Sequence, residues 1–282
     1  MRFKNGCLLM DFFYDIARYE FLQNALLAVI FAGITCGIIG TYIVSRRLVF
    51  LCGGITHSSF GGLGIAFYAG INPISGAMLF AVGSAVGIEW ASSKNKIRED
   101  SAIGIIWSVG MAVGALFMSL TPGYTSGDMA GYLFGNIITA TSQDIIMLAI
   151  FTLMLTLAAI LWWRPVMYLA FDRSYSATQG LSTRWVSYAM SIITAIAIVL
   201  CIRVMGIVLL LSLFTIPVVA ANTFTHSYAK LTIASVVITT IASVVGLILS
   251  YTWDIPTGVS IIFTLCVVLI AVKILSLRSK KF

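Results

Sequence analysis

Apolar blocks of bilayer length follow one another along this chain, and they constrain its fold more than any other feature. A helix needs about 20 apolar residues to cross the hydrocarbon core of a membrane. Hydrophobic residues make up 60% of the 282 positions and charged residues only 10%, whereas a soluble domain has about 25% charged residues. Nine blocks of suitable length occur at 21–44, 50–70, 74–91, 101–120, 144–163, 185–202, 205–224, 231–251 and 257–276.

These blocks predict an all-α polytopic membrane protein with about eight to nine transmembrane helices and a single transmembrane domain over residues 1–282. Block 205–224 is the least secure crossing, because it contains Pro217 and begins directly after Arg203. Residues 1–20 mix basic and acidic side chains, and no small-residue cleavage site follows them. We expect this stretch to form an interfacial N-terminal segment leading into the first span.

The basic residues are distributed unequally between the two sides of the predicted bundle. In membrane proteins, the loops on the cytoplasmic side carry an excess of Lys and Arg. If the loop after the first span is cytoplasmic, that side collects thirteen of the 17 basic residues. They are Arg46, Arg47, Lys94, Lys96, Arg98, Arg164, Arg173, Arg184, Lys230, Lys273, Arg278, Lys280 and Lys281. This topology places the C-terminus in the cytoplasm and accounts for the net charge of +7 without a nucleic-acid partner.

The predicted inner loop 164–184, RPVMYLAFDRSYSATQGLSTR, is long and amphipathic. It has helical character, and Gly180 near its end can stop a helix. Since the chain has no other cytoplasmic domain, we interpret this loop as a docking surface for another protein rather than as a simple connector.

Several classes of function lack the residues that they need. No phosphate-binding Walker loop is present, so this chain does not hydrolyse ATP by itself. A serine hydrolase needs a nucleophile beside a general base, but Ser58 directly follows His57 and points elsewhere on a helix. An ion-coupled carrier usually buries ionisable groups near the membrane midplane, and His57 is the one such group well inside an apolar block. We therefore expect no catalytic residues in this chain, and a secondary carrier has weak support.

Small residues surround His57 in the stretch GGITHSSFGG (53–62). On a helix, Gly53, His57 and Gly61 share one face, and Gly54, Ser58 and Gly62 form a parallel row. Such rows let helix backbones approach closely in lipid, so we expect these residues to pack inside a bundle or line a pore. His57 is then either hydrogen-bonded to a neighbouring helix or a ligand for a transition-metal ion.

Five segments in the same order resemble the permease subunits of zinc, manganese and iron ATP-binding-cassette (ABC) importers, over about residues 20–275. They are SRRLVFLCGGITHSSFGGLGIAFYAG (45–70), EDSAIGIIWSVGMAVGALFMSL (99–120), YLFGNIITATSQDI (132–145), AFDRSYSATQGL (170–181) and IRVMGIVLLLSLFTIPVVAA (202–221). The resemblance implies an ABC importer permease-type bundle with small-residue-rich packing in a bacterial inner (plasma) membrane.

The resemblance also implies partners and a cargo. These are a homodimer of this chain, a cytoplasmic ATP-binding subunit that drives alternating access, and an extracytoplasmic metal-binding protein. No cofactor is bound permanently: the transported divalent ion is zinc, iron or manganese, and ATP is bound by the partner. The ATPase-coupling positions implied are Phe171, Asp172, Ala177, Gly180 and Leu181.

One position departs from the family pattern. The resemblance implies a metal site at His57 with an aspartate three residues earlier, but Gly54 stands there in this chain. Imidazole ligands suit zinc and iron(II), whereas carboxylate-rich sites suit manganese, so zinc or iron is the favoured cargo. Two alternatives remain open at this stage: a cobalamin- or siderophore-type ABC permease and an ion-coupled secondary carrier.

Overall fold

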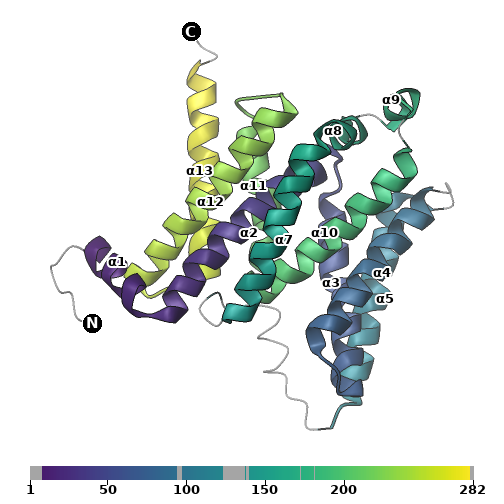
Figure 1. Ribbon diagram of the computed structural model, residues 1–282, viewed down its shortest axis with the longest axis horizontal. Helices are drawn as coiled ribbons and strands as arrows, with labels where there is room; N and C mark the ends of the chain where they lie inside the picture. Colours follow the sequence, from purple (N-terminus) through teal and green to yellow (C-terminus); the bar gives the residue numbers. More distant parts are fainter. Residues whose placement is uncertain are drawn as a thin grey trace.

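The structure, a computed structural model, describes residues 8–93, 97–122, 137, 140–171, 173–180 and 182–279. Over these residues the chain is helical and has no strand (Figure 1). The helices are α1 (Leu8–Arg18), α2 (Glu20–Ser45), α3 (Val49–Ala69), α4 (Pro73–Ser93), α5 (Glu99–Ser119), α7 (Ser142–Leu161), α8 (Trp163–Phe171), α9 (Arg173–Thr178), α10 (Thr183–Met205), α11 (Ile207–Ala221), α12 (Tyr228–Trp253) and α13 (Thr257–Ser279).

Eight of these helices are long and apolar enough to cross a membrane, which confirms the predicted number of spans. The ninth apolar block forms α11, a helix of only 15 residues with Pro217 inside it. At 1.5 Å per residue it is about 22 Å long, shorter than the hydrocarbon core of about 30 Å. Gly206, with φ of 78°, separates it from α10. A left-handed backbone of this kind suits glycine, so α10 ends there and the chain turns back.

The bundle has two groups of helices (Figure 1). Helices α3, α4 and α5 pack tightly together on one side, while α2, α11, α12 and α13 pack on the other. Helix α10 joins the groups because it contacts α4 and α3 as well as α7 and α2. The C-terminus lies at the end of the bundle that carries α8 and α9, and the N-terminus lies at the opposite end.

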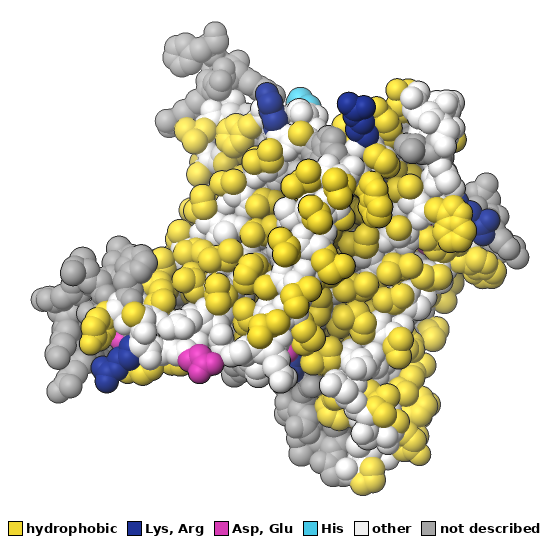
Figure 2. Space-filling view, in the orientation of Figure 1, with side chains coloured by type: hydrophobic (Ala, Val, Ile, Leu, Met, Phe, Trp, Pro, Cys, Tyr) yellow, Lys and Arg dark blue, Asp and Glu magenta, His cyan; other side chains and the backbone are white. Residues whose placement is uncertain are grey.

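The outer surface is divided in the way that a membrane requires. Hydrophobic side chains cover the broad middle of the molecule, and charged side chains lie toward its two ends (Figure 2). Large aliphatic side chains such as Leu153 on α7 and Val267 on α13 are exposed in that band. Because lipid tails solvate these side chains, exposure here is consistent with a lipid-facing surface.

Glycines set the distance between neighbouring helices. A Cβ atom added at Gly37 on α2 would lie 2.5 Å from the Cα atom of Val236 on α12, and one at Gly33 would lie 2.8 Å from Thr240 Oγ1. On the other side of the bundle, a Cβ at Gly64 of α3 would lie 2.5 Å from the carbonyl oxygen of Gly114 on α5. These backbones therefore approach more closely than any larger residue allows, as expected for helices that associate in lipid.

Polar side chains within the spans are satisfied mostly inside the bundle. Thr35 on α2 and Thr152 on α7 share a hydrogen bond of 2.9 Å between their hydroxyl oxygens. Other hydroxyls donate to the carbonyl one turn earlier on their own helix, as Thr239 does to Ser235 at 2.6 Å. This local bonding lets a hydroxyl lie in an apolar environment at little cost.

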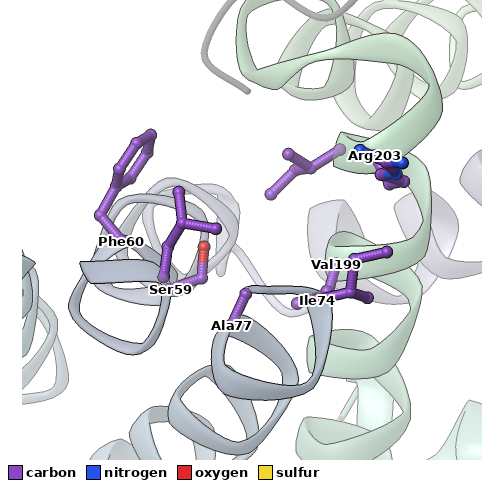
Figure 3. Close-up of a pocket in the computed structure, with 8 residues that line it drawn as sticks. Ser59, Phe60, Ile74, Ala77, Val199 and Arg203 are labelled. Atoms are coloured by element: carbon purple, nitrogen blue, oxygen red, sulfur yellow. The ribbon is translucent and has the colours of Figure 1, made fainter. Parts of the chain in front are cut away.

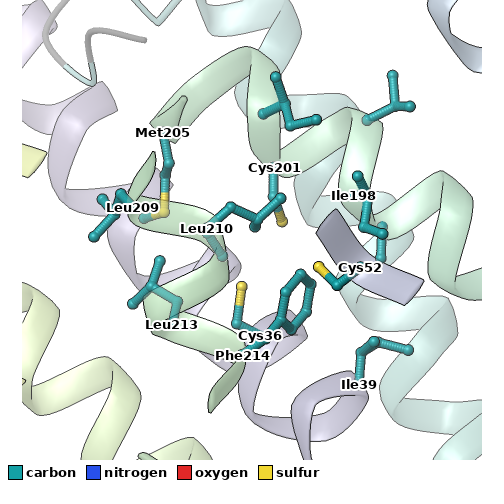
Figure 4. Close-up of a cluster of buried hydrophobic side chains, with 14 of the residues drawn as sticks. Cys36, Ile39, Cys52, Ile198, Cys201, Met205, Leu209, Leu210, Leu213 and Phe214 are labelled. Atoms are coloured by element: carbon teal, nitrogen blue, oxygen red, sulfur yellow. The ribbon is translucent and has the colours of Figure 1, made fainter. Parts of the chain in front are cut away.

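The centre of the apolar core is formed where α2, α3, α10 and α11 meet (Figure 4). Cys36, Cys52 and Cys201 contribute thiols there, beside Phe214 and Leu210. All three cysteines are buried and none forms a disulfide. They behave as small apolar side chains that fill space between closely packed helices.

Helix α1 packs at the N-terminal end of the bundle. The ring of Phe12 is buried and meets Tyr251 of α12 edge-on, with ring centroids 5.3 Å apart. The Tyr251 hydroxyl donates a hydrogen bond to the Asp15 carboxylate. Tyr14 on the same helix is exposed. These contacts join α1 to α12 within the protein, so the interfacial location of residues 1–20 stays a prediction. Residues 1–7 lie outside the described part.

The glycine contacts predict a large difference between two similar substitutions. In Gly114→Ala, the new methyl group would lie 2.6 Å from the carbonyl oxygen of Phe60, a backbone atom that cannot rotate away. We expect the free energy of unfolding to fall by about 1–3 kcal/mol, the usual cost of overpacking. In Gly258→Ala, the nearest atom would be 3.9 Å away, so stability should be unchanged or slightly higher. Thermal unfolding of the purified protein in detergent measures both; equal melting temperatures would contradict the close-packing account.

Candidate functional site

His57 lies in the middle of α3 and faces α5. Its imidazole stacks on the indole ring of Trp107, with ring centroids 4.5 Å apart and an angle of 4° between the planes. The side chain is half-buried. Within the described residues, Nδ1 of this imidazole is buried and has no hydrogen-bond partner. Part of the ring remains accessible, and the surrounding described helices leave Nδ1 without a hydrogen-bond partner.

Gly54, three residues before His57 on α3, lies where the neighbouring helix leaves no room for a side chain. A Cβ atom at Gly54 would lie 2.5 Å from Cγ2 of Ile103 on α5. Ile103 itself is buried. Helix α5 thus fills the position where the resemblance implied an aspartate. Gly53, which faces Trp107 instead, has more space, since its Cβ would lie 3.6 Å from the indole.

The remaining small residues of the stretch hold α3 against two helices. A Cβ atom at Gly110 of α5 would lie 2.5 Å from Cα of Ser58. At Gly61 it would lie 2.6 Å from Cζ of Phe80 on α4, and at Gly62 it would overlap the carbonyl oxygen of Gly76, also on α4. Ser58, Gly61 and Gly62 are all buried. In this chain they face neighbouring helices, whereas His57 and Gly53 are only partly covered.

The hydroxyl groups beside His57 are engaged within α3. Ser58 Oγ donates to the carbonyl of Ile55 at 3.0 Å, and Ser59 Oγ donates to that of Thr56 at 2.6 Å. Neither bonds to the imidazole, so the contacts give no nucleophile–base pair. Across the described residues, no group of three or more His, Cys, Asp or Glu side chains is arranged to hold a metal. His57 therefore offers one ligand, and a metal site there needs further ligands from outside the described chain.

A partly buried ion pair lies toward the end of the bundle opposite α8 and α9. Nε of Arg203, near the end of α10, is 3.3 Å from Oδ1 of Asp144, and the aspartate is only 6% exposed. Asp144 also completes a capping box with Thr141 at the start of α7. Arg203 lines a cavity of about 30 Å³ with Ser59, Phe60, Ile74, Ala77 and Val199 (Figure 3). The pair joins α7 to α10 beside α3, and because 59 residues separate its members, no local sequence pattern reveals it.

The segment predicted to be a docking surface forms two short helices at the opposite end, α8 and α9. Phe171, at the end of α8, is 62% exposed and meets Tyr228 of α12 edge-on at 5.8 Å. Ala177 is exposed on α9, and Gly180 ends the segment with φ of 73°. Asp172 and Leu181, also predicted as coupling residues, lie outside the described residues.

Two residues that contact His57 and Gly54 were not predicted from the sequence. Trp107 and Ile103 both come from α5, about 50 residues after His57 and Gly54. The sequence singled out the glycine-rich turns of α3 but not which side chains fill the space that they leave. The available signal was a tryptophan between Gly104 and Gly110, two glycines of the same helix.

Comparison with known proteins identifies relatives over nearly the whole chain. Residues 18–276 match the ABC 3 transport family. A probable metal transport system membrane protein of Chlamydia muridarum is 37% identical over 243 residues, which is 84% of this chain and 83% of that protein. The manganese transport system membrane protein MntC of Listeria monocytogenes is 27% identical over 259 residues, 92% of each chain.

Among solved structures, the fold is similar to PsaBC from Streptococcus pneumoniae in complex with Fab. The TM-score is 0.82 with 24% identity, and the match covers 94% of this chain and 95% of that one. This likeness confirms the predicted all-α bundle of helices of membrane-spanning length.

The contact between Gly54 and Ile103 predicts how an introduced carboxylate would behave. Gly54→Asp alone should lower the free energy of unfolding by about 1–3 kcal/mol, because its Cβ meets the Ile103 methyl group. Gly54→Asp combined with Ile103→Ala should recover part of this loss, and Ile103→Ala alone serves as the matched control. Thermal unfolding of the four proteins gives the coupling energy. Additive losses would show that Ile103 is not what excludes a side chain at position 54.

Proposed function

The chain belongs to the ABC 3 transport family, and on that basis we propose that it is the membrane-spanning permease of an ABC importer for a divalent transition-metal ion. The observation that carries the proposal is the environment of His57. It is a half-buried imidazole in the middle of a membrane-spanning helix, and its Nδ1 has no partner within the described residues. An imidazole in this position is a suitable transient ligand for zinc, iron(II) or manganese(II).

The cargo class is further supported by the relatives. Proteins of similar sequence are called probable metal, manganese or probable iron transport system membrane proteins. In this chain, Gly54 supplies no carboxylate, so imidazole nitrogen is the main protein ligand at the site. That ligand favours zinc or iron(II) over manganese. A single ligand per subunit also binds weakly, which suits a site from which the ion must leave.

A second copy of the chain completes the site in this proposal. Helices α4 and α5 present small residues that nothing in the described chain covers: a Cβ atom at Gly83 or Gly104 would find no atom within 4 Å. Ser108, one turn after Gly104, is exposed as well. Small residues on an uncovered face permit close approach of another helix in lipid. In the dimer that we propose, the two His57 side chains line a common path for the ion.

The ATP-binding partner docks on α8 and α9. This end of the bundle also carries the C-terminus (Figure 1), and the excess of basic residues in its loops supports a cytoplasmic location for it by the positive-inside rule. The exposed Phe171 touches Tyr228 at the start of α12. Movement of the docked ATPase would reach a long transmembrane helix through this contact. ATP binds to the partner, and a metal-binding protein delivers the ion at the opposite, extracytoplasmic face.

The central test is metal uptake into proteoliposomes containing this chain and its partner ATPase. We expect uptake of radioactive zinc or iron(II) to require ATP, and His57→Ala to lower it by about 10-fold or more, since even outer-shell partners of metal ligands contribute 10- to 100-fold. Ser58→Ala is the matched control, because its hydroxyl bonds only to its own helix.

Two outcomes would contradict the proposal. Uptake driven by a proton gradient without ATP would favour the ion-coupled carrier. Uptake of a cobalamin or an iron–siderophore complex, with no uptake of the free ions, would favour the larger cargo.

Docking of the ATPase gives a separate prediction. Phe171→Ala should weaken binding of the ATPase by about 10-fold, because exposed aromatic side chains often dominate interfaces. Trp253→Ala, which removes an exposed aromatic side chain at the other end of the bundle, is the control. Affinity is measured by titrating the purified ATPase onto the permease in nanodiscs. An unchanged affinity for Phe171→Ala would remove this residue from the docking surface.

A further inference from the structure

The contact between α3 and α5 changes character at Trp107. Over most of its length this contact is formed by glycines, with Gly110 against Ser58 and Gly114 against Phe60. At Trp107, close to Gly110 on the same helix, a large indole occupies the space instead. It lies along the row of Gly53 and His57: the Gly53 position is an ordinary contact distance from the indole, and the imidazole stacks on it.

No anionic group lies on the same turn of α3. Position 54 is glycine, and the hydroxyls of Ser58 and Ser59 donate to carbonyls of their own helix. A metal ion bound to His57 would place a positive charge on the imidazole and its surroundings without a carboxylate from the residues on this turn. The face of an aromatic ring carries negative electrostatic potential. Indole, which attracts cations more strongly than other aromatic side chains do, is the ring that covers this imidazole.

We propose that Trp107 is a positioning residue for the transported ion: its π face fixes the His57 ring and stabilises the metal-loaded imidazole. The inference rests on the proposed function, because it requires that His57 binds the cargo. The nearly parallel rings, 4° apart, hold the imidazole in one plane. Stacking covers a face of the ring and not its edge, where the nitrogens lie, and Nδ1 on that edge is buried and has no hydrogen-bond partner within the described residues.

This arrangement has a consequence for selectivity. The attraction between a cation and a π face depends on charge and not on coordination chemistry. The imidazole bond therefore decides which ion is preferred, and ions with high affinity for imidazole are favoured over manganese. Removing the π face should weaken all divalent ions by a similar factor and leave their order of preference unchanged.

The test uses the assembled transporter in proteoliposomes and the concentration dependence of zinc uptake. Trp107→Leu keeps an apolar side chain but removes the π face, and Trp107→Phe keeps a weaker one. Phe117→Leu is the matched control, because Phe117 also makes an aromatic contact between α5 and α3, to Tyr68 with ring centroids 5.5 Å apart. We expect KM to rise about 3- to 10-fold in Trp107→Leu, to rise less in Trp107→Phe, and to stay unchanged in Phe117→Leu, with kcat retained.

Other results would overturn the inference. If His57→Ala impairs uptake while Trp107→Leu keeps the wild-type KM, Trp107 has no role toward the ion and the proposed function stands. If kcat and thermal stability fall equally in Trp107→Leu and Phe117→Leu without a change in KM, Trp107 only packs the helices. If His57→Ala itself has no effect, the proposed function fails, and this inference fails with it.

A second readout does not depend on transport. Co²⁺ bound at His57 would quench the fluorescence of an indole stacked on it. Titration of the complex in nanodiscs should therefore show quenching that is smaller in Trp107→Phe and absent in His57→Ala. Equal quenching in wild type and Trp107→Phe would show that Co²⁺ binds away from Trp107, against the proposal. Trp107→Phe also keeps the test valid if Trp107→Leu does not fold.

Discussion

Close approach of helix backbones is the constraint on which the rest of this structure depends. Between helices in lipid there is little hydrophobic gain from association, so packing contacts and internal hydrogen bonds must supply it. The glycines of α3 and α5 provide these contacts, with Gly64 against Gly114 and Gly110 against Ser58. Because the two backbones lie this close, little space remains between them for larger side chains such as Ile103 and Trp107. The packing of the two helices therefore fixes where these side chains lie. The site at His57 is a result of that packing.

The same constraint explains the form of the site. Ile103 occupies the space beside Gly54, and Trp107 covers the imidazole of His57. A tightly packed interface with one partly accessible imidazole offers a single nitrogen ligand and no carboxylate from its own turn. In the proposed function, such a site binds an ion weakly and releases it, as a transport pathway needs. The ligands that are missing from one subunit then have to come from a second copy or from water.

The sequence predicted the architecture well because hydrophobic length is a direct consequence of bilayer thickness. Eight spans were identified correctly, and the block with Pro217 was recognised as insecure; it forms the short helix α11. The contacts around His57 were less predictable. Spacing on one helix shows which residues share a face, but it does not show that Ile103 and Trp107 from α5 fill the space opposite Gly54 and His57. The ion pair of Arg203 and Asp144 was missed for the same reason, since it depends on how α7 and α10 pack.

The central claim is that the imidazole of His57 is a ligand for the transported ion. X-ray absorption spectroscopy at the zinc edge, on the permease in nanodiscs loaded with Zn²⁺, tests it most directly. The account predicts nitrogen ligands at about 2.0–2.1 Å with the outer-shell scattering of an imidazole ring, and loss of that signal in His57→Ala. Identical spectra for the two proteins, or a first shell of oxygen atoms alone, would contradict it.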